Sequence, residues 1–317
     1  SDVIVIEPLQ AKSMNYNFIG TEHLLREEQK MEEKSHSPVS CFAETGKSVY
    51  GIKCISHRGE EFDAPEGSRP SYELAVERKA DIVKLDVCFT KDGIPVMSHD
   101  TVLKRTMGWD VAIQNQTYRE ILEKGVFLKV GEYGNEKIVT FSEVLQIVKG
   151  VPEFWIDFKS VPAGGLEKLV SELSKADISL NRVMFATFDQ KGLADAKVKY
   201  PGVRRVAHTC ISRVADGSFT ANFGAGKFDS KEALIKAVLS AKEEFGLYGV
   251  NLPVTEFENK SLIKEDLQAL RQAGLWCSLW FIHTAETAAY AETLGCDAFV
   301  TGRINAVRPY CRHQAEK

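Results

Sequence analysis

The sequence predicts an α/β protein, and within that class a (β/α)8 TIM barrel of parallel strands. From Gly51 onward, short apolar stretches alternate with amphipathic helical ones, the pattern of βαβ units and a parallel sheet. The chain holds about eight such units, the number that closes a barrel. No GxGxxG or GxxxxGK[ST] loop supports a nucleotide-binding sheet, so the closed barrel is the better prediction.

Strand-like stretches are short runs of apolar, β-branched and aromatic residues. The predicted strands are 52–56, 82–88, 95–99, 154–159, 182–188, 203–208, 248–252, 276–282 and 297–301. The second and third are joined by FTKDG, a tight turn where a βαβ unit would have a helix. This turn is an irregularity in the barrel pattern.

Helices are predicted between most of the strands, and several end at Gly, a common residue at helix C-termini. Examples of the predicted helices are 71–80, 141–150, 165–176, 231–246, 261–274 and 285–295. Two long connections remain, at 100–140 and 212–230, and connections of that length usually have local structure or function. The second is rich in Gly and contains three Phe, so it is a candidate lid over a pocket.

Residues 1–50 differ from the rest of the chain. They include the charged run LLREEQKMEEKSHS, which suggests a solvated helix or a loose arm. We therefore divide the chain into an N-terminal extension at 1–50, of unknown role, and a barrel domain at 51–312.

Bulk composition excludes some partners. A formal net charge of −4 and a pI near 6.0 give no electrostatic footprint for nucleic acid or anionic membrane. No apolar run approaches the ~20 residues that span a bilayer. The seven cysteines show no CxxC or metal-ligand spacing. The first residue is Ser1, which fits a processed secreted or periplasmic chain without excluding a cytoplasmic one, so localisation and oligomeric state stay open.

The stretch DIVKLDV (81–87) places two charges on one face of a strand. Because strand side chains alternate, Val83 and Leu85 share one face while Lys84 and Asp86 share the other. Charges that leave solvent normally have partners. This face is therefore either a buried ion pair or part of a site.

Other strand ends repeat this pattern, and barrel enzymes place their chemistry at the C-terminal ends of strands. The first strand runs into His57 and Arg58, and the third into His99. The fourth, FWIDFKS, carries Asp157 and Lys159 on one face. Each residue alone has an ordinary structural explanation, such as a core histidine or an ion pair. The recurrence of charged residues at the ends of four successive apolar strands favours a site.

These segments resemble the glycerophosphodiester phosphodiesterase family. Its members carry HRG, then APENT, ExD on the second strand, TKDG with a following HD, an ExK strand and a tryptophan near the seventh strand. The matching segments here are 56–108, 138–160 and 279–305, and the resemblance covers roughly 51–310. It implies a barrel with a small insertion after the third strand, which fits residues of about 100–140.

The resemblance also implies an activity. Family members hydrolyse a phosphodiester, typically glycerol 3-phosphate joined to an alcohol, to glycerol phosphate and the free alcohol. By position, His57 and His99 would be the general base and the general acid, and Arg58 and Lys159 would hold the phosphate. A divalent ion, Mg or Ca, would bind carboxylates at the strand ends. These residue types suit proton transfer at a phosphodiester, whose anionic oxygens need cationic partners.

Three positions depart from the family pattern. APENT is APEGS, which keeps Glu66, and Asp157 stands for the Glu of ExK. The largest departure replaces the Glu of ExD by Lys84, followed by Leu85 and Asp86. A protonated Lys has no lone pair for a cation. It would repel one ~4 Å away by roughly 4 kcal/mol per unit charge at an effective dielectric of ~20. The metal site should therefore be weakened or absent.

Lys84 leaves three alternatives. In the preferred one, its ammonium takes the place of the ion and bridges Asp86, Asp157 and Glu66. In the second, a metal still binds through Glu66, Asp86 and Asp157 while Lys84 turns to the phosphate. In the third, the site binds phosphodiesters without cleaving them.

The sequence thus favours a phosphoric diester hydrolase acting on a small-molecule phosphodiester. The alternatives are a phospholipase D-like barrel that forms a cyclic phosphate and a binding module without activity. Trp280 and Phe281 are either a stacking wall over the substrate or core residues, and Arg303 is either a phosphate contact or a surface residue. The candidate substrate-binding residues are Arg58, Lys84, Lys159 and Trp280.

Overall fold

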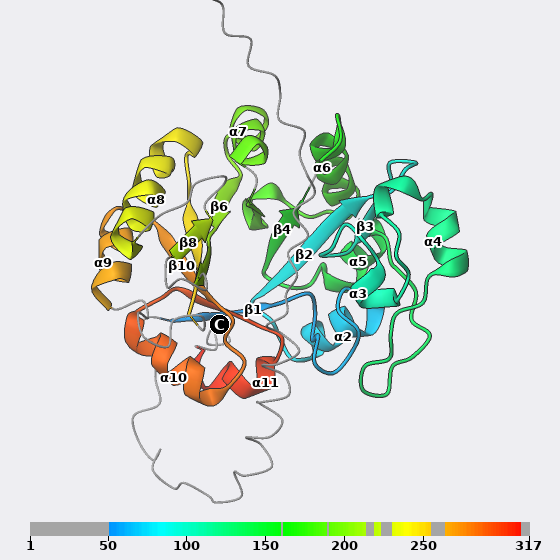
Figure 1. Cartoon of the computed structure of the whole chain (residues 1–317), viewed down its shortest axis with the longest axis horizontal. Coiled ribbons are helices and arrows are strands. Elements are labelled where there is room, and N and C mark those ends of the chain that lie inside the picture. The colour runs from blue at the N-terminus through cyan, green and yellow to red at the C-terminus, as the bar shows by residue number, and fades with distance from the viewer. Residues whose placement is uncertain are drawn as a thin grey trace, which may run out of the picture. The chain divides into compact units, whose positions relative to one another are not determined.

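A computed structural model gives the fold of the chain (Figure 1). It describes residues 51–159, 161–188, 190–213, 219–222, 230–254 and 264–311. The chain divides into two units, 1–46 and 47–317, and all described residues belong to the second. The extension predicted at 1–50 lies outside the described residues, so its boundary and role stay predictions.

In the described part of the chain, eight parallel strands close into a barrel (Figure 1). Closure is complete because β1 pairs in parallel with both β2 and β11. The barrel strands are β1 (Lys53–Ser56), β2 (Ile82–Phe89), β4 (Glu153–Phe158), β5 (Val183–Thr187), β6 (Arg204–His208), β9 (Gly249–Pro253), β10 (Trp276–Trp280) and β11 (Ala298–Thr301). The predicted (β/α)8 barrel is confirmed.

Helices connect the strands and cover the outside of the barrel (Figure 1). They are α2 (Arg69–Glu77), α5 (Phe141–Val148), α6 (Gly165–Lys175), α7 (Gln190–Lys199), α8 (Lys231–Phe245), α9 (Lys264–Gln272), α10 (Ala285–Leu294) and α11 (Ile304–Val307), with short 3-10 turns at Leu180–Arg182 and Arg308–Tyr310. Helix α2 begins two residues before its predicted start because Ser68 caps it and Pro70 occupies its first turn. Helix α7 was not predicted, because QKGLADAKVK contains a glycine and gives a weak amphipathic pattern.

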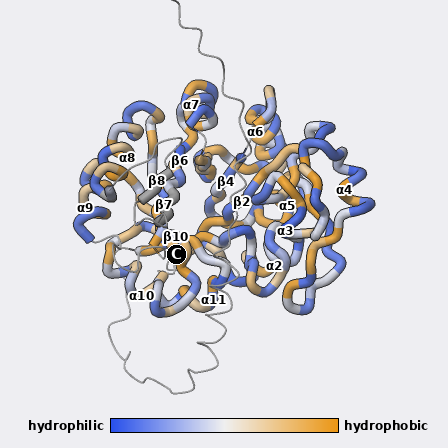
Figure 2. Tube along the Cα trace, viewed as in Figure 1, coloured by the Kyte–Doolittle hydropathy of each residue, from blue (hydrophilic) through white to orange (hydrophobic). Residues whose placement is uncertain are grey.

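Side chains alternate across the barrel wall, and each face has its own apolar partners. On β2, Val83, Leu85 and Val87 point outward into the core that the helices cover. A second apolar cluster, which includes Trp155, fills the barrel interior. In Figure 2 the outer helices carry both hydrophilic and hydrophobic residues, as expected of elements with one face on the sheet and one toward solvent. Lys84, on the opposite face of β2, therefore points into the barrel.

Strand β3 (Pro95–Met97) is not a barrel strand. It pairs antiparallel with β2, so it continues the sheet beyond the barrel wall. The reason is the TKDG turn, where the Gly93 amide donates to the Thr90 carbonyl and Gly93 takes a φ of 71°. A connection this short can only return the chain antiparallel. Of the four strand ends that the sequence grouped together, three therefore belong to the barrel, and His99 follows a hairpin strand.

The connection after β3 is a small structured insertion. It contains α3 (Lys104–Met107), a 3-10 turn (Ile113–Asn115) and α4 (Tyr118–Lys124), whose start is a capping box formed by Thr117 and Glu120. Its apolar side chains form a cluster of their own, which includes Leu103, Met107, Ile113, Ile121 and Phe127. This cluster holds α3 against the barrel.

The predicted connection at 212–230 is partly described. It includes an antiparallel hairpin of β7 (Cys210–Arg213) and β8 (Phe219–Asn222). Residues 214–218 and 223–229 lie outside the described residues, so the proposed lid stays a prediction.

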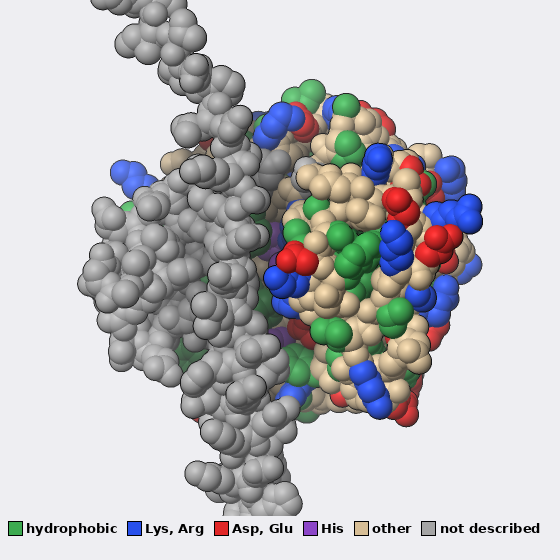
Figure 3. Space-filling model, turned by 45° about the vertical axis from the view of Figure 1, so that its right-hand side comes forward, with side chains coloured by type: hydrophobic (Ala, Val, Ile, Leu, Met, Phe, Trp, Pro, Cys, Tyr) green, Lys and Arg blue, Asp and Glu red, His purple; other side chains and the backbone are tan. Residues whose placement is uncertain are grey.

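The face of the molecule in Figure 3 carries Lys and Arg side chains interspersed with Asp and Glu. No described helix has the length and apolar content that a membrane span requires. Five cysteines in the described part of the chain are free and buried, namely Cys54, Cys88, Cys277, Cys296 and Cys311.

Candidate active site at the C-terminal end of the barrel

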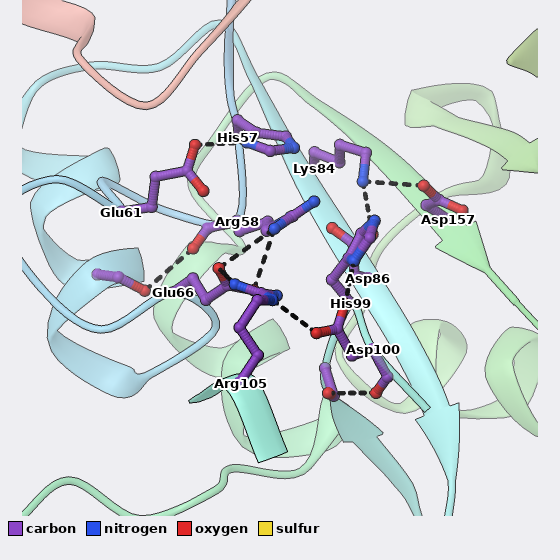
Figure 4. A network of polar contacts seen from close by, with 12 residues as sticks. His57, Arg58, Glu61, Glu66, Lys84, Asp86, His99, Asp100, Arg105 and Asp157 are labelled. Atoms are coloured by element: carbon purple, nitrogen blue, oxygen red, sulfur yellow. Dashed lines mark hydrogen bonds and ion pairs between the residues drawn. The ribbon is translucent and has the colours of Figure 1, made fainter. Parts of the chain in front are cut away.

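Four charged side chains meet inside the barrel, and we call them the inner ion cluster: Lys84, Asp86, Asp157 and Lys159. Asp86 and Asp157 are register partners on the adjacent parallel strands β2 and β4, which places their carboxylates side by side. The Lys84 ammonium lies 2.6 Å from Asp86 and 2.8 Å from Asp157 (Figure 4). The Lys159 ammonium lies 2.9 Å from Asp157 and 3.4 Å from Asp86. Each lysine therefore bridges both carboxylates.

The inner ion cluster is buried and electrically balanced. The Lys84 side chain is 4% exposed and that of Asp157 is 1% exposed. Burial raises the pKa of Asp86, but the ammonium groups of Lys84 and Lys159 outweigh it and hold that pKa well below its usual range. The same two lysines hold the pKa of Asp157 low against burial. Both carboxylates are therefore ionised at neutral pH.

His208, at the end of β6, extends this cluster. Its Nε2 lies 3.0 Å from Asp157 Oδ2, although the contact is angled away from ideal hydrogen-bond geometry. Its Nδ1 lies 3.0 Å from the side-chain nitrogen of Asn251, and the Ser278 hydroxyl donates to the side-chain oxygen Oδ1 of Asn251 at 2.7 Å. The ring stacks between Trp155 and Phe188. Burial lowers the pKa of His208, so a neutral ring with its proton on Nε2 satisfies this chain of donors and acceptors.

His57 directly follows β1, and its backbone amide donates to the Thr301 carbonyl of β11. Its side chain is 4% exposed, and Nδ1 lies 2.6 Å from Glu61 Oε1. The ring packs against Phe281 at a centroid distance of 4.5 Å. Burial and the nearby charges of Arg58 and Lys84 hold the pKa of His57 well below its usual value.

His99 reaches the same space from the hairpin strand. The Ser98 amide donates to the Asp86 carbonyl, which keeps the chain after β3 beside β2. His99 Nδ1 lies 2.6 Å from Asp100 Oδ1. Burial, Arg58 and Lys159 hold the pKa of His99 well below its usual value. The two imidazoles are thus alike in one respect, because each presents Nδ1 to a carboxylate.

A second group of charges surrounds His99, and we call it the rim network: Arg58, Glu66, Asp100 and Arg105. Arg105, on α3 of the insertion, forms a bidentate pair with Glu66 at 2.6 and 2.7 Å. Its Nε donates to Asp100 Oδ2 at 2.6 Å, and Arg58 donates to Glu66 at 3.1 Å (Figure 4). Burial raises the pKa of Glu66, but Arg58 and Arg105 lower it to about 2.

A cavity of about 10 Å³ separates the rim network from the inner ion cluster. Four buried polar atoms of its lining residues have no hydrogen-bond partner among the described residues: Arg58 Nε, Tyr72 Oη, Asp86 Oδ2 and Thr106 Oγ1. Its volume and polar lining match one water molecule.

The structure brings most of the predicted site residues together. Figure 4 shows ring and side-chain nitrogens of His57, Arg58, Lys84 and His99 facing one space, with the two imidazoles on opposite sides of it. Trp280, at the end of β10, is 6% exposed and packs on Phe281 at a centroid distance of 4.8 Å. Its indole nitrogen has no partner among the described residues. Its contact with substrate stays a prediction.

Glu66 lies among the arginines of the rim network, and its role as a metal ligand stays a prediction. Both of its carboxylate oxygens accept from arginines of the rim network, and Figure 4 shows it on the Arg105 side of the site. Arg303 lies with its guanidinium 4.3 Å from the centre of the Phe62 ring.

The family follows from comparison with known proteins. The profile described as the "Glycerophosphoryl diester phosphodiesterase family" matches residues 57–306. The chain belongs to the glycerophosphoryl diester phosphodiesterase family. Its members are phosphoric diester hydrolases, so the resemblance seen in the motifs is confirmed.

Individual relatives and structures agree with this family. The chain is similar to a glycerophosphodiester phosphodiesterase of Caldanaerobacter subterraneus subsp. tengcongensis, with 31% identity over 47% of this chain and 63% of that protein. The alignment thus spans less than two thirds of that relative's length.

Two solved structures share the fold. A phosphodiesterase of Oleispira antarctica in complex with the product sn-glycerol-3-phosphate matches with a TM-score of 0.65 at 20% identity, over 83% of this chain and 98% of that one. A glycerophosphodiester phosphodiesterase of Thermotoga maritima matches with a TM-score of 0.59 at 23% identity, over 80% of this chain and 95% of that one.

The family generally uses divalent cations, and the side chains of this member do not fit one. Among the described residues, no group of three or more His, Cys, Asp or Glu side chains could hold a metal ion. Glu66 is paired with two arginines, while Asp86 and Asp157 each lie within 2.9 Å of a lysine ammonium. The charges of the inner ion cluster already sum to zero. A divalent ion there would meet two ammonium groups, which repel it.

Three residues that contact the predicted site residues are not identified by the sequence analysis. The position of His208 at the end of a barrel strand is a signal of the same kind as that of Asp157. Glu61 and Arg105 gave no such signal, because they lie in a loop and on a short helix whose placement depends on tertiary packing.

Proposed function

We propose that this chain hydrolyses a glycerophosphodiester, or a related small phosphodiester, to a phosphomonoester and an alcohol, with one histidine as general base and another as general acid. The observation that carries the proposal is the arrangement of His57 and His99 on opposite sides of one space that also faces Arg58 and Lys84 (Figure 4). In-line displacement at phosphorus needs proton transfer on both sides, to the leaving oxygen and from the attacking one.

The phosphate would bind to cations whose donors are only partly used. An ammonium group has three N–H donors, and in Lys84 and Lys159 two of the three face Asp86 and Asp157. One donor of each lysine therefore remains for a phosphate oxygen. Arg58 adds a planar guanidinium beside them.

The two histidines would divide the proton work. Nδ1 of each ring is occupied by a carboxylate, so Nε2 is the nitrogen left for the reaction. His57 would take a proton from the attacking water as its oxygen bonds to phosphorus. His99, entering the reaction with a proton on both ring nitrogens, would give its Nε2 proton to the alcohol oxygen as the bond from that oxygen to phosphorus breaks. The negative charge of the bound phosphodiester would offset the burial and the cations that lower the pKa of His99. The proton that His57 gains and the one that His99 loses are balanced through solvent before the next turnover.

Lys84 would supply the positive charge that relatives obtain from a metal ion. Its ammonium lies between the carboxylates of Asp86 and Asp157, where the ExD and ExK motifs imply a cation. Two ammonium groups fixed by buried carboxylates form a preorganised positive surface, the kind of electrostatics that stabilises charge on a transferring phosphoryl group. We therefore expect hydrolysis that does not depend on a divalent ion.

The first experiment tests the reaction. Glycerophosphocholine, glycerophosphoethanolamine and glycerophosphoglycerol would each be incubated with the protein and followed by phosphorus NMR. We expect glycerol phosphate from at least one of them, with turnover lowered about 10²- to 10⁴-fold in His57→Ala and in His99→Ala. A cyclic phosphate signal would instead indicate the phospholipase D-like reaction. Binding of a phosphodiester without any product would support the binding module.

The second experiment tests Lys84. Activity should be unchanged by EDTA in the parent protein, whereas Lys84→Glu, which restores the family's ExD, should require added Mg²⁺ or Ca²⁺. Lys91→Glu, at an exposed position in the turn after β2, is the matched control and should behave like the parent. A parent enzyme that EDTA inactivates and Mg²⁺ restores would show that a metal still binds beside Lys84.

A further inference from the structure

We propose that Glu61 is a positioning residue for His57, whose carboxylate holds the imidazole with Nδ1–H toward Glu61 and Nε2 toward the substrate. This inference rests on the proposed function for its consequence, but not for its geometry. The family motifs assign roles to the histidine, to the arginine of HRG and to Glu66, and none of them assigns one to the position of Glu61. The contact that carries the inference is the 2.6 Å separation of His57 Nδ1 and Glu61 Oε1 (Figure 4).

The backbone after His57 is shaped to bring Glu61 back over the ring. Arg58 has a φ of 55° and Gly59 a φ of 82°, so two consecutive residues are left-handed and the chain turns as soon as β1 ends. A Cβ at Gly59 would lie 2.4 Å from Ser71 Oγ, so only glycine fits there. The turn places residue 61 beside residue 57, although Glu61 is four positions further along the chain.

The Glu61 side chain is also closely packed against the end of β11. Its side chain lies against Gly302, at the end of β11, where an added Cβ would come within 2.6 Å of Glu61 Cγ and 2.8 Å of its Oε1. The Gly302 amide donates to His283 Nδ1 at 3.2 Å, which fixes the ring of His283. His283 stacks on Phe281, which in turn packs on His57. The imidazole of His57 is therefore held by an aromatic wall on one side and by a carboxylate at Nδ1.

Glu61 differs from the carboxylate that contacts the other imidazole. Asp100 shares its charge between His99 and Arg105, whereas the one hydrogen-bond partner that the described residues give Glu61 is His57. The charged or titratable groups around Glu61 are Arg58, Glu66, His283 and Arg105. Burial raises the pKa of Glu61 to about 7 in spite of Arg58.

This environment gives the ionisation of Glu61 a consequence for His57. The ionised carboxylate accepts from Nδ1–H and leaves the Nε2 lone pair free, as a general base requires. The protonated carboxyl instead donates to Nδ1, and the neutral ring then carries its proton on Nε2, where it cannot accept another from water. The decrease in kcat/KM as pH falls should therefore follow the protonation of Glu61 and not only that of His57.

The first arm of the test measures the ring without substrate. Nitrogen-15 NMR of histidine-labelled protein, with the His57 signals assigned from His57→Gln, reports which ring nitrogen carries the proton. At pH 8 we expect the Nδ1–H tautomer in the parent and predominantly the Nε2–H tautomer in Glu61→Ala. The same tautomer in both proteins would overturn the proposal. This arm gives an answer even if no substrate is hydrolysed, so it separates a failure of this inference from a failure of the proposed function.

The second arm uses the substrate that the hydrolysis assay identifies. We expect Glu61→Ala to lower kcat about 10- to 100-fold with little change in KM, and Glu61→Asp to recover part of that loss. Glu61→Gln removes the titration but keeps an acceptor, so the acid limb of its kcat/KM profile should move from near pH 7 to lower pH. Glu73→Gln, at a half-exposed surface position on α2, is the matched control. An unchanged kcat and acid limb in the Glu61 variants would contradict the assigned role.

Discussion

The inner ion cluster and the rim network hold equal numbers of charged groups but are built in different ways. The cluster draws its charges from neighbouring strands β2 and β4, whose register fixes the two carboxylates beside each other. The network depends on Arg105, which comes from the insertion and whose side chain is 46% exposed. The Lys84 side chain, by contrast, is 4% exposed. The barrel strands thus fix the geometry of the inner ion cluster, whereas the packing of the inserted helix α3 on the barrel fixes that of the rim network.

This difference predicts which of the two groups should better tolerate substitution of one of its residues. A buried ion pair that loses one partner leaves an uncompensated charge in a medium that solvates it poorly, so the barrel-wall cluster should be intolerant. A partly exposed arginine leaves groups that water can reach. The rim network should therefore tolerate loss of a member better, and any effect should concentrate on His99.

The largest expected effect is that of Lys84→Met. It leaves two buried carboxylates to one lysine, and we expect a loss of about 3–5 kcal/mol in the free energy of unfolding. Urea unfolding followed by circular dichroism measures it. Lys104→Met, which removes an exposed pair with Asp110, is the control and should cost less than about 1 kcal/mol. Equal losses of unfolding free energy in the two variants would show that the ion pairs of Lys84 contribute no more to stability than the exposed pair of Lys104.

An acid titration measures how strongly the rim network holds the charge of Glu66. Its pKa is lowered from 4.5 to about 2 in the folded protein, so it adds stability that is fully present above pH 4.5 and lost as pH falls toward 2. Glu66→Gln cannot titrate, so its deficit in stability relative to the parent should shrink by roughly 3 kcal/mol between pH 5 and pH 2. Unfolding curves at several pH values test this. A deficit that stays constant with pH would mean that Glu66 titrates normally.

The smallest of these effects is expected for Arg105→Ala. Glu66 keeps Arg58 as a partner, so we expect a loss of about 1–2 kcal/mol in the free energy of unfolding. Asp100 loses its arginine, so turnover should fall more than stability suggests, through the placement of His99. The comparison to make is with Arg119→Ala, an exposed pair with Glu123 on α4, which should leave both quantities near the parent's. Turnover equal to the parent's in Arg105→Ala would separate the rim network from catalysis.

The sequence predicted the barrel because its strands and helices have strong, local signals. The alternation in DIVKLDV predicted that Lys84 and Asp86 share one face of the strand, and this face lies inside the barrel because helices cover the apolar one. It did not predict that β3 lies outside the barrel, although the short TKDG turn carried that information.

The sequence predicted the residues of the candidate site that lie at strand ends. Motif positions indicated His57, His99 and Lys159, each of which lies within two residues of the end of a strand. The partners that orient them, Glu61 and Arg105, lie on a turn and on an inserted helix. Their contacts depend on left-handed backbone at Arg58 and on the packing of α3, and no local pattern of residues encodes either.

The charges of the inner ion cluster and the rim network cancel, with Arg58, Lys84, Arg105 and Lys159 opposed by Glu66, Asp86, Asp100 and Asp157, and Glu61 adds a negative charge beside His57 when it is ionised. A phosphodiester diffusing toward the barrel therefore experiences little long-range attraction and is recognised only within hydrogen-bond range. We therefore expect that added salt does not slow the encounter, since the site has no net positive charge whose attraction salt could screen.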